Sequence, residues 1–402
     1  MRRVDRGANG MLPPRRTNQL RIAGTSAVAV TALLLCLHVR GASPFKDPMI
    51  SKIEAIFAPW SDARSPGLAV LVRKDDHTIF ERGYGVRDLR TFTAIDATTN
   101  FRLASCTKQF TAMAIMLLVH EGKLRYDQPL TEIFPEFPAY GKAITVRHLL
   151  NHTSGLQDYE VLMQTAKHPG WTEENQIHDA DVLSLLETET NAVLFPPGTK
   201  WAYSNSGYVV LGLIAAKVSG KSFGQFLNER IFAPLKMKQT IAYEKGQNEV
   251  ANRAFGHTKQ ANGWKQTDQS STSATLGDGG VYSSLRDLAK WDDALGHPTL
   301  LGENEMRAAW NPVELVGGAR PQWPADSDRL AGTPVAYGFG WFLDPYHGRP
   351  RMWHYGETTG FHTYIERFAG DGALTVVVLC NRTDLNPEQL AANVADLSPA
   401  PR

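Results

Sequence analysis

The chain has 402 residues, of which 43% are hydrophobic and 21% are charged, and its 42 Lys and Arg nearly balance 41 Asp and Glu to give a net charge of +1. This is the composition of a globular protein, with enough length for one large domain or two closely packed ones. A net charge near zero generates no long-range field toward nucleic acid or acidic lipid. We therefore expect a small-molecule or peptide substrate and no nucleic-acid partner.

The N-terminus has the pattern of an export signal. Arginines at positions 2, 3, 6, 15, 16 and 21 precede an apolar run over residues 27–39, and Gly41 and Ala42 follow it. A basic segment, an apolar segment and small residues in this order are typical of a secretory signal. The run is shorter than the ~20 apolar residues of a membrane span. We predict that residues 1–43 are a signal peptide or an uncleaved signal anchor, that any membrane link is through this segment, and that the protein is periplasmic or secreted.

Strand-like patterns lie at both ends of the remaining chain. Residues 67–73 and 78–86 flank a turn-like Lys74-Asp75-Asp76 and predict a β-hairpin. Near the C-terminal end, residues 338–343, 362–368 and 374–379 are also strand-like, and Gly370-Asp371-Gly372 is a turn between the last two.

Between these strands the apolar residues recur at helical spacing, over 107–121, 145–151, 179–188, 206–219, 222–231 and 285–294. We predict an α+β fold in which N- and C-terminal strands form one antiparallel sheet flanked by helices, with a mostly helical domain inserted. The folded domain is expected over residues 44–390, with an α/β part at about 50–124 and 330–395 and a helical part at about 125–329. A site is expected where the two parts meet.

The first chemical motif is Ser105-Cys106-Thr107-Lys108 at the start of a predicted helix. Residues three apart share a helix face, so the lysine amine can reach the serine hydroxyl, and a desolvated lysine can act as a base. Alternatively, Ser105 is a helix N-cap. A second Ser-x-x-Lys, at Ser43, contains a proline and precedes no helix, and it illustrates how such a motif arises by chance.

The second motif is Tyr203-Ser204-Asn205, which precedes an apolar helix. The Tyr203 phenol can take a proton from the serine if a nearby ammonium charge lowers its pKa from about 10. Asn205 offers a donor and an acceptor to a substrate amide. The alternative is a buried aromatic followed by an N-capping asparagine.

The third motif contains His354-Tyr355-Gly356-Glu357 and lies between strand-like stretches. Gly356 would allow close approach of the backbone to a ligand. His354 is alternatively a hydrogen-bonded structural residue.

These three motifs, in this order, resemble those of the serine β-lactamase and penicillin-binding-protein family, especially its class C β-lactamase, DD-peptidase and esterase branch. Two further stretches, residues 148–156 and 279–288, are similar to that branch, and the resemblance covers roughly residues 67–381. The resemblance implies a serine hydrolase that forms an acyl-enzyme at Ser105. Lys108 and Tyr203 would share the proton transfers, and Asn205, His354, Gly356 and Glu357 would contact the substrate. The backbone N–H groups of Ser105 and Glu357 would form the oxyanion hole.

One departure bears on the substrate. β-Lactamases and most transpeptidases carry Lys-Thr-Gly where this chain has His354-Tyr355-Gly356. With an unperturbed pKa near 6.5 such a histidine is only about a quarter protonated at pH 7, so this wall would be mostly neutral and would gain charge toward pH 6. We expect hydrolysis of esters or amides. The alternatives are a D-alanyl-D-alanine carboxypeptidase or β-lactamase, and a catalytically silent homologue that binds cell-wall peptide or protein.

No cofactor or metal is expected. His148 and His152 stand four residues apart but lack the glutamate of a zinc motif, so a structural turn is favoured. Gly277-Asp278-Gly279-Gly280 lacks the lysine and spacing of a phosphate-binding loop. Cys106 and Cys380 have the apolar surroundings of small buried side chains, and Cys106 lacks the context of a cysteine-protease nucleophile.

Overall fold

The computed structural model of the protein describes residues 48–165, 170–325 and 331–398. The chain divides into two units, Met1–Phe45 and Lys46–Arg402, and all described residues belong to the second. The predicted export segment and the second Ser-x-x-Lys motif fall outside the described residues, and the predicted domain bounds stay a prediction. No helix within the described ranges is both long enough and apolar enough to cross a membrane.

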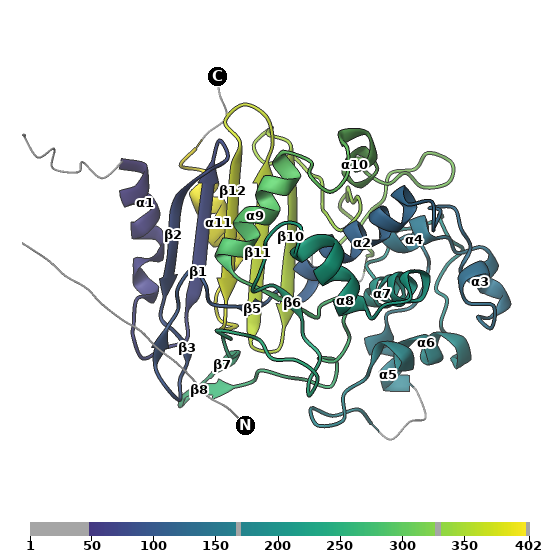
Figure 1. The fold of residues 1–402 in the computed structure, drawn as a ribbon, viewed down its shortest axis with the longest axis horizontal. Helices are drawn as coiled ribbons and strands as arrows, with labels where there is room; N and C mark the ends of the chain where they lie inside the picture. The colour runs from purple at the N-terminus through teal and green to yellow at the C-terminus, as the bar shows by residue number, and fades with distance from the viewer. Residues whose placement is uncertain (1–47, 166–169, 326–330, 399–402) are drawn as a thin grey trace, which may run out of the picture. The chain divides into compact units, whose positions relative to one another are not determined.

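The central feature is a five-stranded antiparallel sheet in the order β10-β11-β12-β1-β2. In Figure 1 the N-terminal strands, in purple, lie beside the C-terminal strands, in yellow. Strands β1 and β12 join the two ends of the chain in a continuous register from Leu68 opposite Cys380 to Lys74 opposite Leu374. The strands are β1 (Leu68–Lys74), β2 (His77–Tyr84), β10 (Arg351–Thr358), β11 (Phe361–Phe368) and β12 (Leu374–Cys380).

The predicted α+β fold with terminal strands in one sheet is confirmed, but two strand assignments change. Residues 338–343 do not form a strand, because Tyr337 and Phe342 pair only through isolated bridges. The third motif, expected between strands, is itself strand β10. The sheet therefore carries His354 and Gly356 directly, in register with β11.

Both faces of the sheet are covered, which explains why β1 and β12 are apolar at nearly every position rather than at every second one. Leu68, Val70 and Val72 of β1 pack in one core, whereas Ala69 and Leu71 pack in the other. The first core lies against helices α1 and α11, and α9 contacts β1 from the second face (Figure 1). These helices are α1 (Pro48–Phe57), α9 (Leu285–Gly296) and α11 (Pro387–Ala395).

The inserted part is mainly helical, as predicted. Helix α2 (Lys108–His120) is buried along almost its whole length and contacts α7 (Asn205–Ser219), α8 (Phe223–Leu227) and α10 (Glu303–Trp310). The predicted helix over 222–231 ends at Leu227 and continues as a π-helical turn over Asn228–Phe232. The other α-helices of the described residues are α3 (Leu130–Ile133), α4 (Val146–Leu150), α5 (Tyr159–Thr165) and α6 (Asp179–Thr188).

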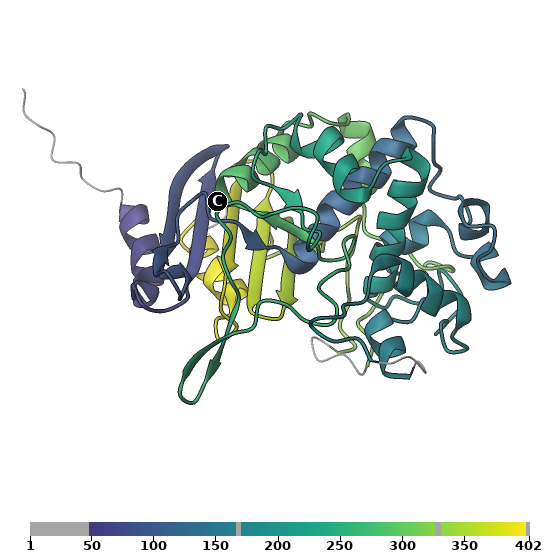
Figure 2. The same cartoon turned by 60° about the horizontal axis from the view of Figure 1, so that its bottom comes forward.

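Short strands position the segment that carries Ser105. Strand β9 pairs with β5, so that Phe101 lies opposite Ser283 immediately before the Ser105 turn. The β7–β8 hairpin extends away from the sheet in Figure 2. These strands are β3 (Val86–Asp88), β4 (Thr93–Ala94), β5 (Phe101–Arg102), β6 (Ile241–Ala242), β7 (His257–Gln260), β8 (Gly263–Gln266) and β9 (Val281–Ser283).

Candidate active site

Ser105 lies in a tight turn that leads from strand β5 into helix α2. The turn is a 3-10 segment over Ala104–Thr107, and Ala104 adopts a positive φ of 47°. A residue with a Cβ in this region stores roughly 1–3 kcal/mol of strain, which persists only where the surroundings enforce it. The N-cap of α2 is Thr107, which forms no side-chain cap, so the alternative of Ser105 as an N-cap is wrong. The half-buried serine side chain lines a pocket instead.

Strand β10 holds this turn from one side. The Leu103 carbonyl accepts hydrogen bonds from the Cys106 N–H at 3.1 Å and from the Thr363 hydroxyl at 2.9 Å. A Cβ at Gly356 would lie 2.2 Å from the Leu103 carbonyl oxygen and 2.4 Å from the Thr363 hydroxyl oxygen. Glycine is therefore required at position 356 because the strand passes directly against the backbone that carries Ser105.

Lys108 reaches Ser105 from the first turn of α2. Its Nζ donates to the Ser105 hydroxyl at 3.0 Å, to Asn205 Oδ1 at 2.9 Å and to the Asp278 carbonyl at 3.0 Å. The side chain is fully buried, and burial lowers its pKa to about 8 although Asp278 and Asp158 act in the opposite direction. A fraction of this amine is neutral near pH 7 and can accept a proton from the hydroxyl.

Tyr203 lies over the same ammonium, with Lys108 Nζ 4.9 Å from the centre of its ring. Its buried hydroxyl forms no well-formed hydrogen bond to the described residues. Burial raises the pKa of Tyr203 well above its ordinary value, and the interaction with the Ser105 hydroxyl lowers it by less. The condition under which Tyr203 could take a proton, a pKa lowered by the neighbouring ammonium, is not met, because desolvation dominates at this phenol. Tyr203 keeps its proton and is suited to donate it.

Asn205 is the first residue of α7, and the helix cap is Ser204, whose hydroxyl accepts from the Gly207 N–H. The alternative of Asn205 as the N-cap is therefore wrong. Its amide oxygen accepts from Lys108, and its backbone N–H donates to Asp158 Oδ2 at 2.7 Å. The side chain also lines the pocket at Ser105.

His354 does not line this pocket. Its side chain is fully buried in β10, and its Nε2 lies 3.1 Å from the Tyr337 hydroxyl while Nδ1 lies 2.6 Å from the Tyr355 carbonyl. Since a carbonyl can only accept, Nδ1 carries the proton and Nε2 accepts from Tyr337. Burial, and secondly the charge of Lys108, lower the pKa of His354 to about 3. The wall is neutral as expected, but the expected gain of charge toward pH 6 is wrong because the imidazole is sealed from water.

The pocket beside Ser105 is narrow, with a volume of about 50 Å³, and acidic groups line it. The sequence predicted Ser105, Asn205 and Glu357 in this region but not Glu160. Asp278 was named only as part of a glycine-rich stretch that does not match a phosphate-binding loop. A signal was present in the sequence, since Asp158-Tyr159-Glu160 follows the family-like stretch 148–156 by two residues. The complete lining is Arg102, Ala104, Ser105, Tyr159, Glu160, Asn205, Thr272, Thr275, Asp278, Gly279, Glu357 and Thr358.

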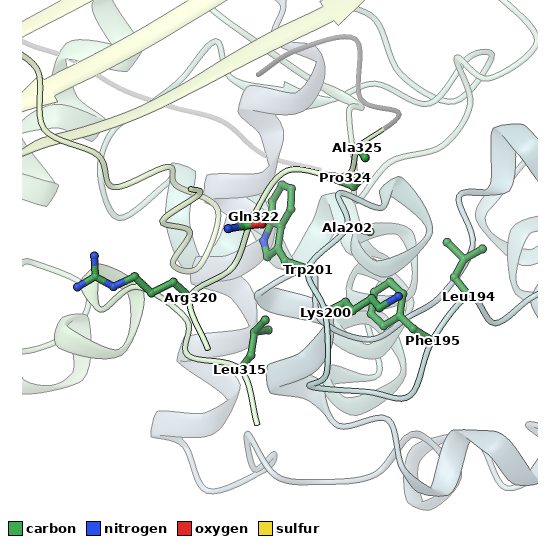
Figure 3. Close-up of a pocket in the computed structure, with 10 residues that line it drawn as sticks. All are labelled: Leu194, Phe195, Lys200, Trp201, Ala202, Leu315, Arg320, Gln322, Pro324 and Ala325. Carbon is green, nitrogen blue, oxygen red and sulfur yellow. The ribbon is translucent and has the colours of Figure 1, made fainter. Parts of the chain in front are cut away.

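A larger cavity of about 530 Å³ lies on the segment that leads into Tyr203. Figure 3 shows the Trp201 side chain, on the same segment as Lys200, beside Gln322 of the opposite segment. Ser105, Lys108 and Tyr203 are not among its lining residues. Its size therefore does not mark it as the candidate site, whereas the smaller pocket is lined by Ser105.

The remaining candidates have structural roles. His148 Nδ1 accepts from the Thr145 N–H at 3.2 Å, and His152 Nδ1 accepts from the Ser204 N–H at 3.2 Å. Within the described ranges no group of three or more His, Cys, Asp or Glu is placed to hold a metal. Cys106 is buried and directs its thiol at the His354 carbonyl, and burial raises its pKa to about 12, which argues against a nucleophile. Cys380 is also buried, as predicted.

Comparison with known proteins decides the family. The model of the beta-lactamase family matches residues 52–400. The chain belongs to this family. It is a serine hydrolase, of the class that acts on esters or amides through an acyl-enzyme.

Curated relatives and solved structures agree with this assignment. Penicillin-binding protein 4* of Bacillus subtilis is 28% identical, over 86% of this chain and 74% of that protein. A D-aminopeptidase of Cereibacter sphaeroides is 28% identical, over 79% of this chain and 57% of that protein. Among solved structures, D-amino acid amidase from Ochrobactrum anthropi superposes with a TM-score of 0.71 at 23% identity, over 87% of this chain and 98% of that one. At this identity the superposition establishes the fold alone.

Proposed function

We propose that Ser105 is the nucleophile of this hydrolase, with Lys108 as the base and Tyr203 as the proton donor. The neutral amine of Lys108 takes the hydroxyl proton as Ser105 Oγ attacks the carbonyl carbon of an ester or amide. Tyr203 gives its proton to the leaving group, and the C–O or C–N bond breaks to leave the acyl group on Ser105. A water molecule then attacks the ester and gives a proton to the Tyr203 phenolate, and Lys108 returns its proton to Ser105 Oγ as the acyl bond breaks and the acid is released.

The observation that carries this proposal is the environment of Lys108. The amine is fully buried, has a pKa of about 8, and lies 3.0 Å from a serine oxygen that lines a pocket. A protein that only binds a ligand gains nothing from burying a lysine beside a hydroxyl, because the desolvation is unfavourable. A catalytically silent homologue is therefore disfavoured.

Two further roles come with the proposal. The backbone N–H groups of Ser105 and Glu357 would hold the carbonyl oxygen as it gains negative charge, which is usually the largest single contribution to catalysis. Asn205 would contact an amide of the substrate, as in the family motif it matches. His354 and Gly356 would act through packing, since one is buried and the other abuts the Leu103 carbonyl.

Within the class, we favour amide or ester hydrolysis over β-lactamase or D-alanyl carboxypeptidase activity. β-Lactams and D-alanyl peptides present a carboxylate, and strand β10 offers a buried, neutral His354 where many relatives have a lysine. Similar proteins include a D-aminopeptidase and a D-amino acid amidase, which suggests amides of amino acids as substrates to test. We further propose, from residues 1–43, that the protein is exported.

The test is intact-mass analysis after exposure to a fluorophosphonate, a penicillin and a short-chain ester. We expect stoichiometric labelling by the fluorophosphonate at Ser105, turnover of the ester, and slow or no acylation by the penicillin. Absence of fluorophosphonate labelling would refute the nucleophile. Rapid acylation and turnover of penicillin would move β-lactamase activity ahead of the ester and amide assignment.

A further inference from the structure

Carboxylates from three separate segments line the pocket that contains Ser105. Glu160, in the first turn of α5, and Asp278, in the loop before β9, lie in its wall together with Asn205. Glu357, at the end of β10, lines it as well. Glu160 is exposed as a residue while its carboxyl is partly desolvated, and it makes no ion pair with another described residue.

Asp278 provides an independent indication of a ligand. The residue is 6% exposed, and its Oδ2 accepts from the Tyr159 hydroxyl at 3.2 Å. Its Oδ1 is buried, and no group of the described residues donates to it. A buried carboxylate oxygen without a donor is unfavourable, so a site that holds one is suited to a ligand that brings a donor, ideally a charged one.

The cations near the pocket make no direct ion pair with its carboxylates, although the charge of Lys108 acts on them at longer range. Arg102 is 4% exposed and donates to the backbone carbonyls of Gly279 and Ser273, and Lys108 donates to Ser105, Asn205 and a backbone carbonyl. Both cations are therefore bound to neutral groups. The electrostatic influence of the acids on one another is visible at Glu160, whose pKa is raised to about 7 by burial and then by Asp158 and Asp278, against Lys108.

Tyr203, the proposed proton donor to the leaving group, does not line this pocket, whereas Ser105 and Asn205 do. The pocket therefore lies on the acyl side of the scissile bond. A carboxylate on that side would meet Glu160 and Asp278 at close range and would be repelled, whereas an ammonium would be attracted and would supply the donor that Asp278 lacks.

We propose that this pocket selects acyl donors that carry a free ammonium group, and that Glu160 and Asp278 are the residues that determine this specificity. The substrate class is an amide, ester or peptide with an unblocked amino group on its acyl part. This inference rests on the proposed nucleophilic role of Ser105. It predicts that blocking the substrate amine removes the preference while the reaction centre remains intact.

The experiment compares p-nitroanilides or p-nitrophenyl esters of amino acids with free amines against their N-acetylated counterparts, in both stereochemical series. The measured quantity is the ratio of kcat/KM for the free over the blocked substrate, or the ratio of acylation rates by intact mass where turnover is slow. For the wild type we expect a ratio of about tenfold or more at pH 7.5, and for Glu160→Gln and Asp278→Asn a ratio lowered by about tenfold. Glu173→Gln, on an exposed loop, makes the same change in net charge and should keep the wild-type ratio.

An α-amino group with an ordinary pKa of about 8 is only partly charged at pH 7.5, so the rates are expressed per substrate in its ammonium form. On that basis the ratio should also fall from pH 7.5 to pH 6, because Glu160 with a pKa of about 7 gains a proton over this range. The outcomes separate the two proposals. A protein that fluorophosphonate does not label refutes the nucleophile itself. A protein that is labelled but shows equal rates for free and blocked substrates, no acylation by either, or the same ratio in Glu160→Gln as in the wild type, refutes the ammonium pocket alone.

Discussion

The two sides of the site at Ser105 differ in the charge of the side chains that they contribute. Strand β10 contributes a glycine against the Ser105 turn and a buried histidine held neutral at a pKa of about 3. The opposite side contributes Glu160 and Asp278, which are acidic and lack ion-pair partners among the described residues. His354 and Gly356 act by packing, whereas Glu160 and Asp278, together with Glu357 at the end of β10, bring negative charge to the pocket. Substrate charge is therefore expected to be recognised by these carboxylates rather than by the histidine of the third motif.

Burial has opposite effects on the two residues that are proposed to transfer protons. Burial lowers the pKa of Lys108 and raises the pKa of Tyr203, because in each case it disfavours the charged form. The lysine is driven toward a neutral base and the tyrosine is kept a neutral acid. One desolvated environment thereby assigns opposite roles to two adjacent groups.

The largest effect is expected for Ser105→Ala, which removes the atom that forms the acyl bond. Covalent labelling should disappear, and turnover should fall by about 10³-fold or more. The free energy of unfolding should change little, since Ser105 caps no helix. Ser61→Ala, which alters an exposed serine outside the pocket, is the control and should retain full activity. Full labelling of Ser105→Ala would place the nucleophile elsewhere.

Next in size are Lys108→Ala and Tyr203→Phe, each of which should slow acylation by roughly 10² to 10⁴. Their losses should combine less than additively, because both act on one proton path. The two variants should differ in stability. Loss of the Lys108 amine leaves Asn205 Oδ1 and the Asp278 carbonyl without their donor, whereas the Tyr203 hydroxyl has no well-formed bond to lose. Strictly additive losses in acylation would contradict the shared role.

The neutral wall is tested by His354→Lys. If residue 354 were exposed in the cleft, the protein would tolerate a lysine there, and the lysine would improve binding of substrates that carry a carboxylate. At a fully buried position next to Lys108 we instead expect the free energy of unfolding to fall by about 2–4 kcal/mol. Thermal unfolding measures this, with the exposed His347→Lys as the control. A stable His354→Lys variant with faster hydrolysis of nitrocefin would show that the side chain does line the cleft.

The smallest effect concerns pH and separates Lys108 from His354. With a pKa of about 8, the neutral fraction of Lys108 rises from about one tenth at pH 7 to about nine tenths at pH 9, so acylation by a neutral ester should increase about tenfold over this range. Single-turnover rates, corrected for alkaline hydrolysis of the ester, measure this. A profile governed by a group near pH 6.5 would implicate an accessible histidine and contradict the burial of His354.

Local patterns were enough to predict much of this protein. Continuous apolar runs identified β1 and β12, because a sheet covered on both faces needs apolar side chains at successive positions. Helical periodicity identified α2, α6 and α7, and the serine and lysine three residues apart identified a pair that does lie within hydrogen-bond distance. In each case neighbours in the chain carry the information.

Only the tertiary structure decided the charge state and exposure of the site residues. His354 and Tyr203 have polar groups that sequence treats as available to solvent, but β10 and the aromatic side chains around them exclude water and move their pKa values away from neutrality. Glu160 and Asp278 are 118 residues apart in the chain, and they share one pocket because the loop before β9 folds back against α5. Desolvation and the meeting of distant carboxylates depend on packing, which no local pattern of residues encodes.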